Sequence, residues 1–203
     1  RSYLVAGEPG TGKTILTLQY LLEGAKHGEK GVYISIDEKP DHVIQDMKAL
    51  GWDIEPYLQN ELIQILDVTD YFGTAKMDKD SGIDTQKIIH DILTQVRQFQ
   101  TTRLVIDPIA PFVFAESHQP EIAEYIRQLV FAVEEIKGCT TLLTSYVPVG
   151  STQVSQHGIE EFAASGIIVL KLSKLNNKTV RSIWVRKMRG TRIDLSEYSY
   201  EIL

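Results

Sequence analysis

The chain has 203 residues, of which 43% are hydrophobic and 24% are charged. This composition is typical of a soluble folded protein with one full core, and it argues against a disordered chain. No apolar run reaches the ~18 residues that cross a bilayer, so neither a membrane segment nor a signal peptide is expected. Cys139 is the only cysteine, which excludes an internal disulfide and favours a reducing, cytoplasmic setting.

The charges are unevenly distributed along the chain. The net charge is −6, but residues 1–170 contain 13 Lys/Arg and 24 Asp/Glu, a net of −11. Residues 171–192 contain no acid, and their cations are Lys171, Lys174, Lys178, Arg181, Arg186, Lys187, Arg189 and Arg192. An acidic body with one basic segment favours an anionic partner at that segment, or an acidic face of a neighbouring subunit. It argues against a nucleic-acid surface spread over the whole molecule.

Strand and helix patterns alternate along the chain. The first strand is predicted at residues 3–6, which leaves room for further residues of the domain before Arg1. A helix follows from residue 15, with Gly24 and Gly28 marking its far end. A second strand at 31–36, a helix at 40–50 and a third strand at 62–66 come next. Residues 67–83 are polar, with Lys76, Asp78, Lys79 and Asp80 close together, and are expected to form an exposed loop.

The second half continues the alternation. Helices are predicted at 84–99 and 120–137, and strands at 104–106 and 140–144. The strands at 167–174 and 179–186 are joined by a polar turn, and a short strand is predicted at 198–202. The expected fold is α/β: a mostly parallel central sheet with helices on both faces and a C-terminal antiparallel hairpin, in a single domain over residues 1–203.

Residues 7–14 read Gly-Glu-Pro-Gly-Thr-Gly-Lys-Thr and complete the phosphate-binding pattern G-x-x-x-x-G-K-[ST]. They lie between a predicted strand and a predicted helix, which is the context that the motif requires. The alternative is a glycine-rich turn with an incidental lysine. In the favoured interpretation, Lys13 lies at the β- and γ-phosphates and the Thr14 hydroxyl binds Mg²⁺. The predicted nucleotide-binding residues are Glu8, Pro9, Gly10, Thr11, Gly12, Lys13 and Thr14.

Carboxylates follow two of the predicted strands. Asp107 comes directly after an apolar strand, where it is expected to hold the Mg²⁺ shell as a Walker B aspartate does. The alternative is a turn or capping aspartate before Pro108. Asp37 and Glu38 follow another strand and are expected to orient and deprotonate a water molecule, with the longer Glu38 as the base. Asp37 also suits the cap of the next helix. Repulsion between the two carboxylates would raise one pKa.

Lys187 and Arg189 lie in a predicted strand that runs into Gly190. Alternation places these two cations on one face of the strand and Arg186 and Met188 on the other. They could clamp a transferring phosphoryl group as an arginine finger does. They could equally form a solvated cationic edge strand. The spacing alone leaves both interpretations open.

Taken together, the chain resembles the KaiC-type ATPase domain of the RecA-like superfamily. The matching segments are residues 7–14, 21–25, 31–38, 104–108, 158–163 and 187–191. The resemblance implies a RecA-like P-loop NTPase core with ATP and Mg²⁺ bound between the subunits of a ring, usually a hexamer. It also implies that Asp37 and Glu38 activate water, that Lys187 and Arg189 reach the γ-phosphate on the next subunit, and that the ring works with a regulatory protein partner.

The chain departs from the family pattern at two places. Asp37 stands where the family commonly has a glutamate, and the position of an autophosphorylated Ser-Thr pair is occupied by Glu161 and Phe162. Autokinase activity is therefore not expected.

The alternative function is that of a RecA/RadA-like DNA-dependent ATPase. However, residues 147–157, the candidate DNA loop, contain no Lys or Arg, although nucleic-acid affinity rests mainly on phosphate neutralisation. A third reading is an ATP-binding regulator that does not hydrolyse. The intact set of Lys13, Thr14, Glu38 and Asp107 argues against it.

Overall fold

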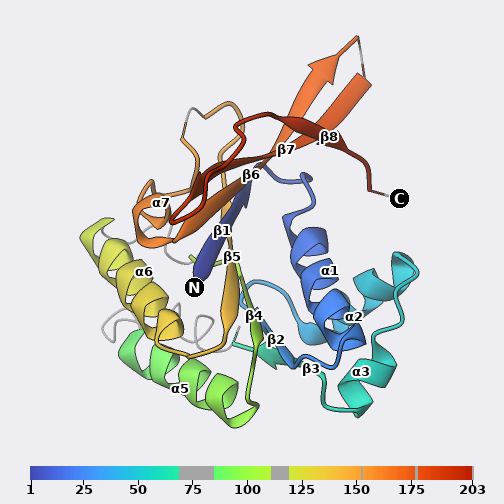
Figure 1. Ribbon diagram of the computed structural model, residues 1–203, viewed down its shortest axis with the longest axis vertical. Helices are drawn as coiled ribbons and strands as arrows, with labels where there is room; N and C mark the ends of the chain where they lie inside the picture. Colours follow the sequence, from blue (N-terminus) through green and yellow to red (C-terminus); the bar gives the residue numbers. More distant parts are fainter. Residues whose placement is uncertain (69–84, 111–118, 152, 177, 203) are drawn as a thin grey trace, which may run out of the picture.

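The computed structural model describes residues 1–68, 85–110, 119–151, 153–176 and 178–202. Within these residues, eight strands form one sheet in the order β3-β2-β4-β5-β1-β6-β7-β8 (Figure 1). The strands from β1 to β6 pair in parallel, and β7 and β8 are added antiparallel. The strands are β1 Ser2–Gly7, β2 Gly31–Ser35, β3 Ile63–Asp67, β4 Arg103–Asp107, β5 Thr140–Tyr146, β6 Gly166–Leu175, β7 Lys178–Met188 and β8 Tyr198–Tyr200. The predicted parallel sheet with a C-terminal antiparallel hairpin is confirmed.

Helices cover both faces of the sheet (Figure 1). One face carries α1 (Lys13–Lys26), α2 (Pro40–Ala49) and α3 (Glu55–Gln59). The other carries α5 (Thr85–Gln98), α6 (Gln119–Glu134) and the single turn α7 (Glu160–Ala163). No helix in these described ranges is long and apolar enough to cross a membrane.

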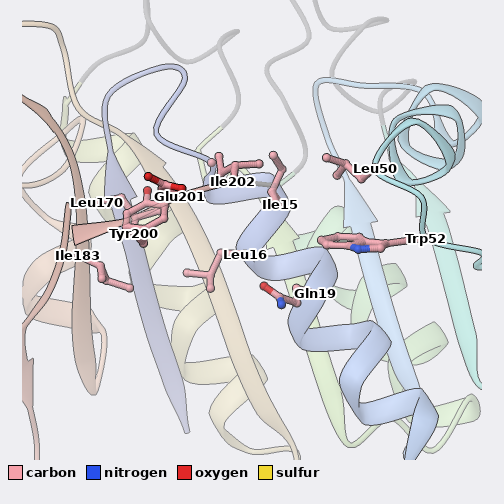
Figure 2. A pocket seen from close by; sticks show the side chains of 11 residues that line it. Ile15, Leu16, Gln19, Leu50, Trp52, Leu170, Ile183, Tyr200, Glu201 and Ile202 are labelled. Atoms are coloured by element: carbon pink, nitrogen blue, oxygen red, sulfur yellow. The ribbon is translucent and has the colours of Figure 1, made fainter. Parts of the chain in front are cut away.

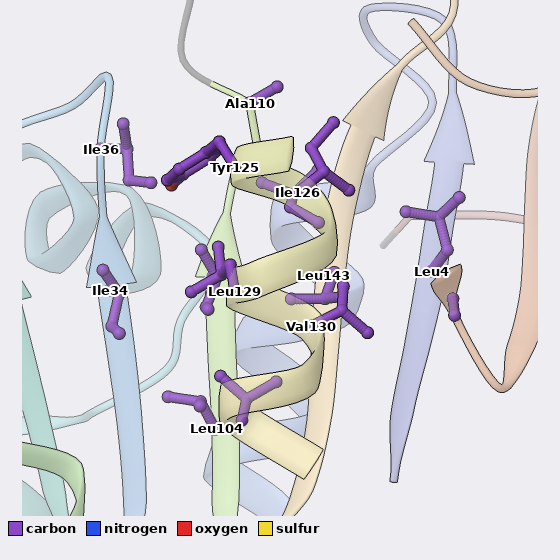
Figure 3. Packing of buried hydrophobic residues seen from close by; sticks show 14 of the residues in the cluster. Leu4, Ile34, Ile36, Leu104, Ala110, Tyr125, Ile126, Leu129, Val130 and Leu143 are labelled. Atoms are coloured by element: carbon purple, nitrogen blue, oxygen red, sulfur yellow. The ribbon is translucent and has the colours of Figure 1, made fainter. Parts of the chain in front are cut away.

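Two hydrophobic cores fill the space between the sheet and its helices. Along β4, Leu104 and Ile106 point into the core beneath α5 and α6, whereas Val105 points into the core beneath α1 and α2. Figure 3 shows the first of these cores, in which α6 with Leu129 and Val130 lies against the strands that carry Leu104 and Leu143. Burial on both faces explains why the central strands read as continuous apolar runs rather than as alternating ones.

Some predicted boundaries were wrong. Helix α1 ends at Lys26, between Gly24 and Gly28, so Gly24 lies within the helix rather than at its end. The lack of a Cβ at Gly24 leaves room for the side chain of Arg103. Gly28, with φ 77°, lies just beyond the helix end. The short helices α3 and α7 were not predicted. The expected loop with Lys76, Asp78, Lys79 and Asp80 lies outside the described residues.

The carboxyl ends of four strands meet at one edge of the sheet. The register pairs Gly7 of β1 with Tyr146 of β5, and Ser35 of β2 with Asp107 of β4. In open α/β sheets, ligands bind at this edge, where the strand order reverses. The segments singled out by sequence at residues 7–14, 37–38 and 107 therefore lie together.

Candidate functional site

The glycine-rich segment between β1 and α1 forms a tight loop. Gly7 ends β1 so close to β6 that a Cβ there would lie 2.5 Å from the Leu170 carbonyl oxygen. Gly12 precedes α1 in the left-handed region, with φ 92°. The first helical hydrogen bond runs from the Leu16 N–H to the Gly12 carbonyl at 2.9 Å. The first turn of α1 therefore presents N–H groups and the positive end of the helix dipole to an anion.

The Lys13 side chain folds back over this loop. Its Nζ donates to the carbonyl oxygens of Gly7 at 2.9 Å and Glu8 at 3.1 Å, and lies 4.7 Å from the centre of the Tyr146 ring. Burial lowers the pKa of Lys13, and the charge of Asp107 opposes this shift. The ammonium is thus fixed beside the first turn of α1, where an added anion would compensate for its desolvation.

Asp107 accepts three hydroxyl hydrogen bonds at the end of β4. Its Oδ2 accepts from Thr14 Oγ1 at 2.8 Å and from the Tyr33 hydroxyl at 2.7 Å, and its Oδ1 accepts from Thr144 Oγ1. Burial and the Asp107 carboxylate hold the pKa of Tyr33 well above its usual value, so Tyr33 remains a donor. The Asp107 carboxylate therefore lies against Thr14 of the phosphate loop.

The oxygen atoms of Thr14 and Asp107 are the donor type that Mg²⁺ prefers. Within the described ranges, no group of three or more His, Cys, Asp or Glu side chains could hold a metal ion by itself. Mg²⁺ commonly takes one or two protein ligands together with substrate phosphates and water. This pair fits that pattern.

Asp37 and Glu38 follow β2, with Asp37 exposed and Glu38 half-buried. The N-cap residue of helix α2 is Lys39, so Asp37 lies two residues before the cap position that the sequence suggested for it. The pKa of Glu38 is raised by burial first, then by the carboxylates of Asp46 and Asp107, and is lowered by His42. A raised pKa was expected, but it arises from burial and Asp46 rather than from repulsion by Asp37.

Lys187 and Arg189 both contact α7. Lys187 Nζ donates to the carbonyls of Glu161 at 2.8 Å and Ala164 at 2.9 Å. Arg189 Nη2 donates to the Phe162 carbonyl at 3.1 Å. Burial lowers the pKa of Lys187, and the charge of Arg189 lowers it further. The two cations therefore lie on one side of the chain, as the alternation predicted.

The strand register separates these cations from the loop of their own chain. Met188 pairs with Gly166, and Gly166 pairs with Tyr3 near the start of β1. The phosphate loop follows Gly7, four residues further along β1, which is about 13 Å at the usual rise per residue. The structure thus brings together the phosphate loop, Asp107 and Glu38, and leaves Lys187 and Arg189 at the opposite edge of the sheet.

Two cavities flank the start of α1. The first, here the phosphate cavity, measures about 500 Å³ and is lined by Lys13, Thr14, Asp107, Tyr146 and Arg181, among others. The second, here the apolar cavity, measures about 460 Å³ and is lined by residues of α1, of the segment after α2, of β6 and β7, and of β8 with the residues that follow it (Figure 2). Gly12, Ile15 and Ile202 line both cavities. A polar and an apolar space side by side match the two ends of a nucleotide.

Comparison with known proteins identifies this arrangement. The family model described as "ATPase: KaiC" matches residues 1–203. The chain belongs to the KaiC family of ATPase domains. A crystal structure of a KaiC-like protein from Pyrococcus horikoshii matches with a TM-score of 0.84 and 32% identity, over 99% of this chain and 85% of that one.

Sequence relatives agree with this membership. A UPF0273 protein of Pyrococcus horikoshii is 32% identical over 98% of this KaiC-family chain and 81% of its own length. The circadian clock protein KaiC3 of Synechocystis is 27% identical over 100% of this chain and 40% of its own length. The resemblance stated from the sequence is confirmed at the level of family and fold.

Sequence reasoning missed four residues that line or support these cavities. Tyr33, Trp52, Arg181 and Tyr200 belong to four different elements or loops. Tyr33 lies in the matching segment 31–38 but was not assigned a role, and the other three lie outside the recognised motifs. Arg181 was noted only as part of the basic segment. The order of the strands brings these residues to the phosphate loop, and that order is not visible in a local sequence pattern.

Proposed function

We propose that residues 1–203 act as a single Mg²⁺-dependent ATPase domain that hydrolyses ATP to ADP and phosphate. The observation that carries the proposal is the convergence of three features at one sheet edge. They are the loop with its held Lys13, the hydrogen-bonded pair Thr14–Asp107, and the half-buried Glu38. Together they supply phosphate binding, metal ligands and a base.

In this mechanism, Glu38 takes a proton from a water molecule whose oxygen attacks the γ-phosphorus. The bond from the γ-phosphorus to the β–γ bridging oxygen breaks, and ADP leaves. Asp37 stands beside Glu38 in support, and Lys13 neutralises charge on the β- and γ-phosphates. Thr14 and Asp107 would hold Mg²⁺, which shields phosphate charge when it is bound. The loop residues Glu8 to Thr14 surround the phosphates.

The nucleobase is assigned to the apolar cavity. Leu16, Leu50 and Trp52 line it, and apolar and aromatic side chains are the usual surroundings of a bound ring system. Because Gly12 and Ile15 border both cavities, a nucleotide with its phosphates over Lys13 can place its base here.

Lys187 and Arg189 are assigned to the ATP of a neighbouring subunit. They lie about 13 Å along the strands from their own loop, yet they are held in a fixed position by the carbonyls of α7. A head-to-tail ring, usually a hexamer in this family, would bring this edge of one subunit to the phosphate cavity of the next. The acidic body and the basic segment of the sequence are complementary in that arrangement. The RecA/RadA-like DNA function has no comparable support in the described residues.

The test is Glu38→Gln, which keeps the size of the side chain and removes the base. It should bind MgATP with unchanged affinity and release phosphate at least about 100-fold more slowly. Glu23→Gln is the matched control, because Glu23 is exposed on α1 and pairs with Lys26. Phosphate release by Glu38→Gln at the rate of the control would remove Glu38 from its role.

A further inference from the structure

The paired strands β7 and β8 each contact the phosphate loop through one side chain. Arg181 of β7 and Tyr200 of β8 are directly paired across the two strands. Arg181 Nε donates to the Gly10 carbonyl at 3.2 Å, and the Tyr200 hydroxyl donates to the Thr11 carbonyl. One cross-strand pair therefore holds two consecutive carbonyls of the loop.

Ile202 extends this contact to a third loop residue. It lies two residues beyond Tyr200, so the alternation of an extended chain directs both side chains to the same side. A Cβ on Gly12 would lie 2.8 Å from Ile202 Cδ1. Arg181, Tyr200 and Ile202 thus contact Gly10, Thr11 and Gly12 in order, and the three side chains are called the clamp below. Figure 2 shows Tyr200 and Ile202 beside the first turn of α1.

The planarity of the peptide bond gives the clamp a functional consequence. The C=O of one residue and the N–H of the next point in opposite directions within one plane. The Tyr200 hydroxyl donates to the Thr11 carbonyl, so the Gly12 N–H of the same peptide plane is turned away from Tyr200. Gly12 borders the phosphate cavity, so fixing this peptide plane also fixes the orientation of a donor beside that cavity. A preorganised donor binds phosphate more tightly, because no loop entropy is lost on binding.

The clamp also borders both parts of the proposed nucleotide site. Tyr200 lines the apolar cavity, Arg181 lines the phosphate cavity, and Ile202 lines both. Burial raises the pKa of Tyr200, and Arg181 opposes this shift. The phenol therefore stays protonated and able to donate at neutral pH.

We infer that Arg181 and Tyr200 are positioning residues for nucleotide binding, and that β8 holds the phosphate loop in its binding conformation. The inference rests on the proposed function, because it assigns the clamp to the same nucleotide site. It adds a role for the C-terminal strand, which contributes to affinity without contributing a chemical group to the reaction.

The experiment compares Tyr200→Phe with Tyr198→Phe. Both variants lose one hydroxyl from β8, but the Tyr198 hydroxyl donates to Asp194 at 2.7 Å in an exposed position. Calorimetric titration with MgADP should show binding about 3- to 10-fold weaker in Tyr200→Phe, the usual range for one lost hydrogen bond, and unchanged in Tyr198→Phe. KM for ATP should rise by a similar factor, while kcat stays within about twofold, because the clamp does not touch the reacting atoms.

Amide exchange without nucleotide tests the clamp independently of binding. Exchange in residues 10–14 should be faster in Tyr200→Phe than in the wild type and in Tyr198→Phe. Equal MgADP affinity in both variants, or unchanged exchange in residues 10–14, would overturn the inference. A loss of melting temperature with unchanged affinity would also overturn it, because the clamp would then be only structural. Failure of the wild-type chain to bind MgADP would instead contradict the proposed function, and the exchange experiment would still report on the clamp.

Discussion

At the scale of single residues, the environment of Glu38 decides whether it can act as a base. Burial raises its pKa first, and the Asp46 carboxylate is the next largest cause. A base must be ionised, so activity falls as the pH drops through this raised pKa. The acid limb of kcat/KM therefore lies at higher pH than an ordinary glutamate would give. The same shift means that Glu38 contributes stability that is fully present below its unfolded pKa and is lost as the pH rises through the folded pKa.

Asp46→Asn tests this electrostatic account. Removing the negative charge of Asp46 lowers the pKa of Glu38, so the acid limb of kcat/KM should move to lower pH while the maximal rate is kept. Asp41→Asn is the control, because Asp41 is exposed on the same helix and is not among the groups that shift Glu38. An acid limb that stays in place in Asp46→Asn would show that Asp46 does not influence the base.

The sequence predicted the residues of recognisable motifs, but not their supports. Lys13 and Thr14 were predicted because they complete a glycine loop that follows a predicted strand. Asp107 was predicted because it directly follows an apolar strand. Tyr33 was read only as part of a strand, although its hydroxyl donates to Asp107. The sequence also did not show that burial and Asp46 raise the pKa of Glu38, since burial depends on packing and Asp46 is eight residues away.

At the scale of elements, the short helix α7 positions the two cations at the end of β7. Its carbonyls accept from Lys187 and Arg189. A bulge opposite Ile167 and Ile168 leaves Arg186 between the paired residues Val185 and Lys187. The long strands were predicted from their apolar runs, whereas α7 is four residues long, too short to show a helical period. The bulge depends on pairing with β6, which the sequence pattern does not reveal.

Arg189→Ala tests the role of this element. Phosphate release should fall by at least about 100-fold, because a positive group at the transferring phosphoryl oxygens is lost. Arg192→Ala is the matched control, since Arg192 is an exposed arginine three residues further along the chain. Both variants should keep the wild-type melting temperature within a few degrees. Equal phosphate release in Arg189→Ala and Arg192→Ala would place Arg189 outside the reaction.

At the scale of the whole molecule, the sheet divides the proposed machinery between its two ends. Glu38, Asp107 and the phosphate loop gather where β1, β2, β4 and β5 end, whereas Lys187 and Arg189 lie level with the start of β1. The α/β fold class could be read from the alternation of strands and helices. The separation of Lys187 and Arg189 from the phosphate loop could not be predicted from the sequence. It depends on the strand order, which places β6 next to β1 and β7 next to β6 although these strands are distant in sequence.

The most direct test of the shared site is phosphate release by a mixture of Glu38→Gln and Arg189→Ala. Each variant alone should be nearly inactive. In a head-to-tail ring assembled at random from equal amounts, about one quarter of the interfaces combine an intact Glu38 with an intact Arg189. Co-assembled variants should therefore recover up to about one quarter of wild-type activity. A mixture that assembles and remains as inactive as its components would contradict a site shared between subunits.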